Sequence, residues 1–343
     1  MGLCQWGQTP LPDLRQKWKK QQGLTPLSQQ DQTPLTPLSR ERLRNRRENV
    51  MYHSVKDIIN ICASENKEFW QVVMASDMQE RGVSSEETMA GMEKLYAAMK
   101  QADREYRADL RSASGLAGGD GEKIKEYNDS GKNICGDFIG SVMEKAVKMG
   151  ESNACMRRIV AAPTAGSCGV IPAVFLTAQE QLGIDDEHMV RAMYVSAGVG
   201  NVIAENAFIA GASGGCQAEI GSASAMAAAG LAFLQGGDET AMAHAAALAL
   251  KNMLGLACDP VCGLVEVPCV KRNVAGAVNA VTSAQMALAG IRSAIPADEV
   301  IDAMRRIGAG MPENVRETAQ GGLATTQTAL EIKNRLKSGN VNK

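Results

Sequence analysis

The sequence contains few aromatic residues and few histidines. Aromatic side chains make up 4% of the 343 residues, and three residues are histidine. With so few aromatic rings, the hydrophobic core must be filled by small and flexible side chains. The 34 glycines and 18 methionines suit close packing of helices better than a β-sheet. Since 45% of the residues are hydrophobic, the composition predicts an all-α protein, a compact multi-helix domain with buried central helices.

A strong net charge, an apolar leader and long apolar runs are also missing. The net charge of −2 gives no general attraction to nucleic acid or to an anionic membrane. The N-terminus has no apolar segment typical of a signal peptide, and the apolar runs at 225–234 and 241–250 are too short to span a bilayer. We therefore expect a cytoplasmic protein with reduced thiols, without a nucleic-acid or membrane partner.

Residues 1–50 differ in composition from the rest of the chain. They carry nine Lys or Arg against four Asp or Glu, five of the eleven prolines, and four copies of Thr-Pro-Leu. No helical or strand period is visible, which predicts a disordered basic extension rich in Pro and Gln. It is either a functional basic tail or upstream sequence included because the start codon was assigned too early. The helical period that begins at Met51 favours the second interpretation.

The catalytic domain is expected over residues 51–340. Its predicted parts are an N-terminal helical portion (51–111), a loop (112–131) and a cluster-binding helical core (132–340). Ser84 and Glu87 form a capping box that opens an amphipathic helix reaching about Leu110. Apolar helices are predicted in the core over 135–149, 169–183, 186–198, 217–235, 238–255, 274–292 and 297–308.

Three glycine-rich loops separate the predicted helices of the core: the first loop (152–169), the second loop (211–219) and the third loop (257–273). They contain six of the nine cysteines, namely Cys155, Cys168, Cys216, Cys258, Cys262 and Cys269. Thiols gathered in such loops indicate a soft-metal or redox site. Zinc modules with two C-x-x-C pairs are excluded by the spacing, whereas an iron–sulfur cluster tolerates scattered thiolates if the loops converge. Each loop taken alone is better explained as a tight connection between packed helices.

Each loop also carries a long and specific segment. These are SNACMRRIVAAPTAGSCGVIPAV, GGCQAEIGSASAMAAAGL and CDPVCGLVEVPCVKRN. Over about residues 51–340 the chain resembles the α chain of bacterial iron–sulfur L-serine dehydratases. The resemblance implies a [4Fe–4S] cluster held by Cys216, Cys258 and Cys269, and deamination of L-serine to pyruvate and ammonia without pyridoxal phosphate. The family usually has a small residue where this chain has Cys262, which leaves Cys262 as a competing ligand.

The substrate-binding residues and the base are less clearly marked. Candidates for binding the serine carboxylate are Asn153, Thr164, Ser167, Arg272 and Asn273. Glu219, one helical turn after Cys216, is a candidate for proton transfer or for a buried structural role. The main base is expected on a separate β chain, because the histidines lie outside the loops and the family's Ser-Ser-Ser-His-Thr segment is absent here. A related lyase acting on another amino acid, such as a cysteine desulfidase, and a non-catalytic cluster-binding subunit remain alternatives.

Overall fold

The computed structural model describes residues 51–338, so the expectations for residues 1–50 lie outside the described part. Residues 51–338 form helices and no β-strand, apart from one isolated parallel bridge between Cys258 and Arg316. The α-helices are α3 (Val55–Glu65), α4 (Phe69–Arg81), α5 (Ser85–Arg104), α6 (Asp120–Asp129), α7 (Gly136–Ala154), α8 (Val170–Leu182), α9 (Asp186–Asn206), α10 (Gly211–Gly214), α11 (Ser222–Leu234), α12 (Glu239–Asn252), α13 (Cys269–Leu288), α14 (Ala297–Gly310) and α15 (Gln327–Lys337). The shorter turns are the 3-10 helices η3 (Ala165–Ser167), η5 (Val261–Gly263), η6 (Glu313–Val315) and η7 (Gly322–Thr325), and the π-helix η4 (Gln217–Gly221). The all-α prediction is confirmed.

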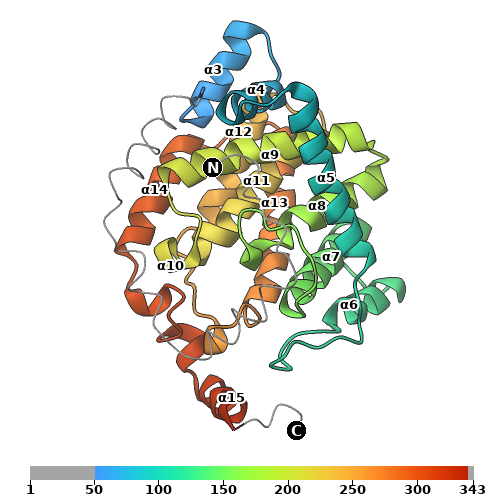
Figure 1. Ribbon diagram of the computed structural model, residues 1–343, viewed down its shortest axis with the longest axis vertical. Coiled ribbons are helices and arrows are strands. Elements are labelled where there is room, and N and C mark those ends of the chain that lie inside the picture. The colour runs from blue at the N-terminus through green and yellow to red at the C-terminus, as the bar shows by residue number, and fades with distance from the viewer. Residues whose placement is uncertain (1–50, 339–343) are drawn as a thin grey trace.

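Helix α11 lies at the centre of the molecule (Figure 1). Every residue from Ser222 to Ala232 is buried, and α11 contacts α8, α9, α12 and α13. A helix that is apolar on all faces can be stable only when other helices cover it. The sequence of α11 therefore places it inside, and its N-terminal end carries the second loop into the interior.

Glycines bring these helices close together. A β-carbon on Gly230 of α11 would lie 2.3 Å from Phe175 Cζ and 2.7 Å from Ser196 Oγ. One on Gly198 of α9 would lie 2.4 Å from Val73 Cγ2. The few aromatic rings pack directly against backbone, which explains how a core with so little aromatic content is filled.

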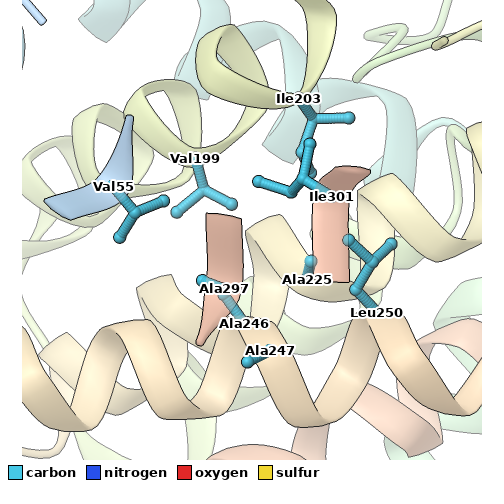
Figure 2. A pocket seen from close by; sticks show the side chains of 9 residues that line it. All are labelled: Val55, Val199, Ile203, Ala225, Ala246, Ala247, Leu250, Ala297 and Ile301. Atoms are coloured by element: carbon cyan, nitrogen blue, oxygen red, sulfur yellow. The ribbon is translucent and has the colours of Figure 1, made fainter. Parts of the chain in front are cut away.

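A small apolar space lies where five helices meet around α11 (Figure 2). Helices α3, α9, α11, α12 and α14 contribute its side chains: Val55, Val199, Ile203, Ala225, Ala246, Ala247, Leu250, Ala297 and Ile301. None of these can hydrogen-bond to a polar ligand, so the space is part of a packing interface.

Several predicted boundaries are confirmed and others are wrong. The capping box is present, with Ser84 Oγ accepting from the Glu87 N–H at 3.2 Å, and the helix it opens ends at Arg104. The predicted loop over 112–131 contains α6, because the buried Glu151 carboxylate accepts a hydrogen bond from the Asp120 N–H at 2.8 Å and so caps the start of that helix. Helix α13 begins at Cys269 rather than at 274.

The structure also bears on the membrane prediction. Within residues 51–338 no helix is both long enough and apolar enough to cross a bilayer.

Candidate functional site

Cys216, Cys258 and Cys269 occupy the ends of three different elements. Cys216 directly precedes the π-helix η4, Cys258 lies between α12 and η5, and Cys269 is the first residue of α13. Their side chains are buried, with exposed fractions of 2%, 3% and 7%. The second loop is held against the third by the Gln217 N–H, which donates to the Leu256 carbonyl at 3.1 Å. π-Helical turns are frequent at functional sites, and this one aims Cys216 toward the third loop.

The three thiols are close enough to affect one another electrostatically. Burial raises the pKa of Cys269 to about 12, and the charge of Cys216 adds to that rise. The pKa of Cys258 is also raised, by burial first and then by Glu219, Cys216 and other charges that include Cys269. Burial raises the pKa of Cys216 to about 11, against the opposing effect of Arg272. Without a metal these are neutral thiols, and a metal would replace their protons.

The donor set fits a cluster better than a single ion. In the part of the chain that the structure describes, no three His, Cys, Asp or Glu side chains are arranged to hold one metal ion. In an iron–sulfur cluster each thiolate binds a different iron atom, so its ligands need not meet at one point. Cys216 from the second loop and Cys258 and Cys269 from the third are therefore a set of buried thiols that could hold such a cluster.

Arg272 supplies the positive charge next to the thiols. Its guanidinium contacts the Cys216 sulfur, donates to the Ala257 carbonyl at 2.7 Å and forms an ion pair with Asp259 at 2.9 Å. The second Asp259 oxygen accepts from the Leu323 N–H at 2.8 Å. Arg272, predicted to bind substrate, is thus held by the chain itself in a position to stabilise a Cys216 thiolate.

Asn273 joins the first loop to the third. Its Oδ1 accepts from the Gly169 N–H at 2.8 Å, and its Nδ2 donates to the carbonyls of Gly166 and Cys269, each at 2.9 Å. The side chain is 1% exposed. All of its hydrogen-bonding groups therefore serve the chain, and its role in the structure is to place the first loop beside α13.

The other predicted substrate residues lie in or next to η3. Thr164 Oγ1 donates to Glu219 Oε1 at 2.7 Å and lies 3.3 Å from Ser167 Oγ. Ser167 is fully buried, and Asn153 Nδ2 donates to the Ala165 carbonyl at 3.2 Å. The structure brings Thr164 and Ser167 to Glu219, while Asn153 braces the outer side of the same turn.

Glu219 and Glu317 bring two carboxylates to the thiols. A β-carbon on Gly211 would lie 2.8 Å from Cys258 Sγ, 3.0 Å from Glu219 Oε2 and 3.3 Å from Glu317 Oε2. Only glycine leaves room for these three groups to surround one point. Burial raises the pKa of Glu219 to about 7, with a further rise from the charge of Glu317. Burial also raises the pKa of Glu317, so the pair is suited to holding or exchanging a proton near neutral pH.

We expect Glu219→Gln to stabilise the metal-free chain by about 1–3 kcal/mol at pH 8 and by much less at pH 5. Burial raises the pKa of Glu219 to about 7 in the folded chain, from an ordinary value of 4.5 for a glutamate side chain in water. The native state therefore loses stability as the pH rises through this interval, because a buried carboxyl must ionise. Urea unfolding at both pH values measures the difference, with the exposed Glu313→Gln as control. An equal effect at both pH values would contradict the assignment.

The remaining thiols and the histidines lie apart from this group. Cys262 is only partly buried, and its pKa is raised by burial and by Glu266 while Lys333 opposes the rise. Cys168 is buried among Ala102, Met149 and Ile159, which agrees with a packing role. Cys135 is exposed at the start of α7 and lies outside the three loops.

Each histidine makes contacts elsewhere in the fold. His53 Nδ1 lies 2.8 Å from Glu205 Oε1, His188 stacks on Phe233, and His244 Nδ1 accepts from the Ser293 N–H. None of these contacts involves a residue of the three loops, so the described part of the chain offers no histidine as a base for this site.

Two residues of the site were not singled out by the sequence. Asp259 follows Cys258 directly, and a carboxylate next to a loop cysteine and thirteen residues before Arg272 is a signal that could have been used. Glu317 lies in a polar segment without a recognisable motif, and nothing in its sequence surroundings points to the site. Glu317 becomes visible only when the segment after α14 is placed beside the third loop, where its N–H donates to the Cys258 carbonyl at 2.7 Å.

Comparison with known proteins agrees with this geometry. A family model described as serine dehydratase alpha chain matches residues 64–324. The probable L-serine dehydratase, alpha chain, of Bacillus subtilis is 46% identical over 289 residues, which cover 84% of this chain and 96% of that protein. The L-serine dehydratase, alpha chain, of Peptoniphilus asaccharolyticus is 39% identical over 288 residues, 82% of this chain and 97% of that one. The L-serine dehydratase of Helicobacter pylori is 34% identical over 287 residues, which cover 80% of this chain and 62% of that longer protein. The chain therefore belongs to the serine dehydratase alpha chain family.

Proposed function

We propose that this chain is the α subunit of an iron–sulfur L-serine dehydratase that, together with a separate β chain, converts L-serine to pyruvate and ammonia. The observation that carries the proposal is that three buried thiols, one from the second loop and two from the third, act on one another electrostatically beside two carboxylates. Family membership supports serine as the substrate. The Bacillus subtilis and Peptoniphilus asaccharolyticus relatives are named as alpha chains, which supports a second subunit.

In this proposal Cys216, Cys258 and Cys269 hold a [4Fe–4S] cluster. When bound, the cluster supplies a Lewis acid for the hydroxyl and carboxylate oxygens of serine. The serine hydroxyl is a poor leaving group, and acid assistance at its oxygen removes the need for pyridoxal phosphate. Arg272 stabilises the Cys216 thiolate, and Asp259 keeps the guanidinium in place.

The chain's own groups then handle orientation and protons. Removal of the Cα proton and loss of the hydroxyl as water leave aminoacrylate, which tautomerises to an imine and is hydrolysed to pyruvate and ammonia. Asn273 holds the first loop so that the Thr164 hydroxyl donates to Glu219 Oε1 with Ser167 beside it, and binding of the serine carboxylate by these hydroxyls would require them to give up their present partners. The Glu219 carboxyl, whose pKa burial raises to about 7, is suited to hold or release a proton near the reacting serine.

The base that removes the Cα proton is proposed to come from the β chain. Each histidine in residues 51–338 has a partner outside the three loops, and proton abstraction needs a base within hydrogen-bonding reach of the Cα proton. We therefore expect the α chain alone, with a reconstituted cluster, to show no serine turnover. Full turnover without the partner would refute the need for a β chain.

The test of the function is anaerobic co-purification with the β chain. Iron, sulfide and serine-dependent pyruvate release are measured in one preparation, with L-threonine and L-cysteine as competing substrates. We expect pyruvate from L-serine, and loss of both colour and activity in air. Preference for L-cysteine would favour a desulfidase, and a coloured complex without lyase activity would favour a non-catalytic cluster-binding subunit.

A further inference from the structure

Two carboxylates face one another beside the Cys258 thiol. Glu219 Oε2 and Glu317 Oε2 lie 3.0 and 3.3 Å from the position where Gly211 would carry a β-carbon. Glu219 Oε1 is occupied by the Thr164 hydroxyl, and in residues 51–338 no side chain donates a hydrogen bond to Glu219 Oε2. This largely enclosed oxygen therefore points, without a partner, at the same space as the Glu317 carboxylate.

No positive side chain balances this pair. Among the described residues neither carboxylate forms an ion pair with Lys, Arg or His, and the guanidinium of Arg272 is already paired with Asp259. The one donor facing Glu317 is the backbone N–H of Ala212. Two carboxylates in an enclosed site repel each other, so a cation between them would lower the energy of the arrangement.

Glu317 is held in place by backbone contacts and remains accessible. The Cys258 N–H donates to the Val315 carbonyl at 2.8 Å, and the Glu317 N–H donates to the Cys258 carbonyl at 2.7 Å. Glu317 itself is exposed, although its carboxylate borders the enclosed thiols. A solute arriving from solvent therefore meets Glu317 before it reaches Cys258 and Glu219.

We propose that Glu317, with Glu219 beside it, binds the α-ammonium group of the substrate. This inference rests on the proposed function. L-Serine carries one cationic group, and its three N–H donors match two carboxylates that otherwise lack a positive partner. The pair would select serine over 3-hydroxypropanoate, which has a hydrogen atom where serine has its ammonium group. Without the ammonium group, both carboxylates would stay without a positive partner.

The test compares two inhibitors that differ only in this group. D-Serine has the ammonium, carboxylate and hydroxyl groups, whereas 3-hydroxypropanoate lacks the ammonium. In the holoenzyme with its β chain, we expect Glu317→Gln to weaken inhibition by D-serine about tenfold or more and to leave inhibition by 3-hydroxypropanoate within about twofold. Glu313→Gln, in the same segment, is the matched control and should change neither. Equal weakening of both inhibitors, or of neither, would overturn the inference.

Measuring iron, sulfide and serine turnover in the wild-type complex distinguishes a failure of the ammonium site from a failure of the proposed function. A wild-type complex that lacks iron or serine turnover would refute the proposed function. A wild-type complex that turns over serine, combined with undiminished D-serine affinity in Glu317→Gln, would refute only the ammonium site. If Glu317→Gln fails to retain iron, Glu317→Asp keeps the charge and should preserve the preference for D-serine over 3-hydroxypropanoate. Loss of that preference in an iron-loaded Glu317→Asp complex would count against the inference.

Discussion

Replacing any one of Cys216, Cys258 and Cys269 by serine is expected to abolish cluster retention and to reduce serine turnover by at least about a hundredfold. Serine is nearly isosteric but a much poorer ligand for iron than thiolate is, and the three thiols are buried and act on one another electrostatically. Iron and sulfide analysis after anaerobic reconstitution, followed by pyruvate release with the β chain, measures both effects.

Cys262→Ser and Cys155→Ser are the matched controls. Cys262 lies in the third loop and Cys155 in the first, and both are partly buried, yet neither is among the charges that act on the three central thiols. We expect both variants to retain iron and activity. Loss of iron in Cys262→Ser together with retention in Cys269→Ser would show that the ligand set has been assigned incorrectly.

Asn273→Ala should reduce both stability and activity. The buried Asn273 side chain is the hydrogen-bond partner of the Gly169 N–H and of the Gly166 carbonyl. The substitution leaves both groups without this partner. The expected cost is about 2–4 kcal/mol in the free energy of unfolding. Since the first loop would lose its attachment to α13, turnover should fall about tenfold or more even where the chain remains folded.

Urea unfolding of the metal-free chain gives the stability change, and pyruvate release at a temperature well below the transition gives the activity change. Asn334→Ala, on the exposed face of α15, should change neither. Wild-type stability in Asn273→Ala would mean that the loop is held by other contacts.

The helical class and much of the core could be predicted from sequence. The apolar residues of α11 recur on all faces, which requires burial by neighbouring helices wherever they come from. The capping box at Ser84 is a local signal, because its two hydrogen bonds join residues only three apart. The cysteine-bearing segments are equally local, and they carry the resemblance that names the family.

The start of α6 shows where such reasoning fails. Its glycine-rich sequence predicts a loop, yet the Glu151 carboxylate accepts from the Asp120 N–H across 31 residues. A cap supplied by a distant side chain leaves no trace in the local pattern, since propensity describes only what a segment does without its neighbours.

The sequence by itself determined the helical class, the central apolar helices with their buried faces and the three loops that carry thiols, but not α6. Only the tertiary structure decided which groups meet: Glu219 with Glu317 around Gly211, Arg272 with Asp259, and Asn273 with the first loop. The physical reason is that periodicity records which side of a helix is buried, whereas hydrogen bonds and charges between distant segments depend on how the helices pack.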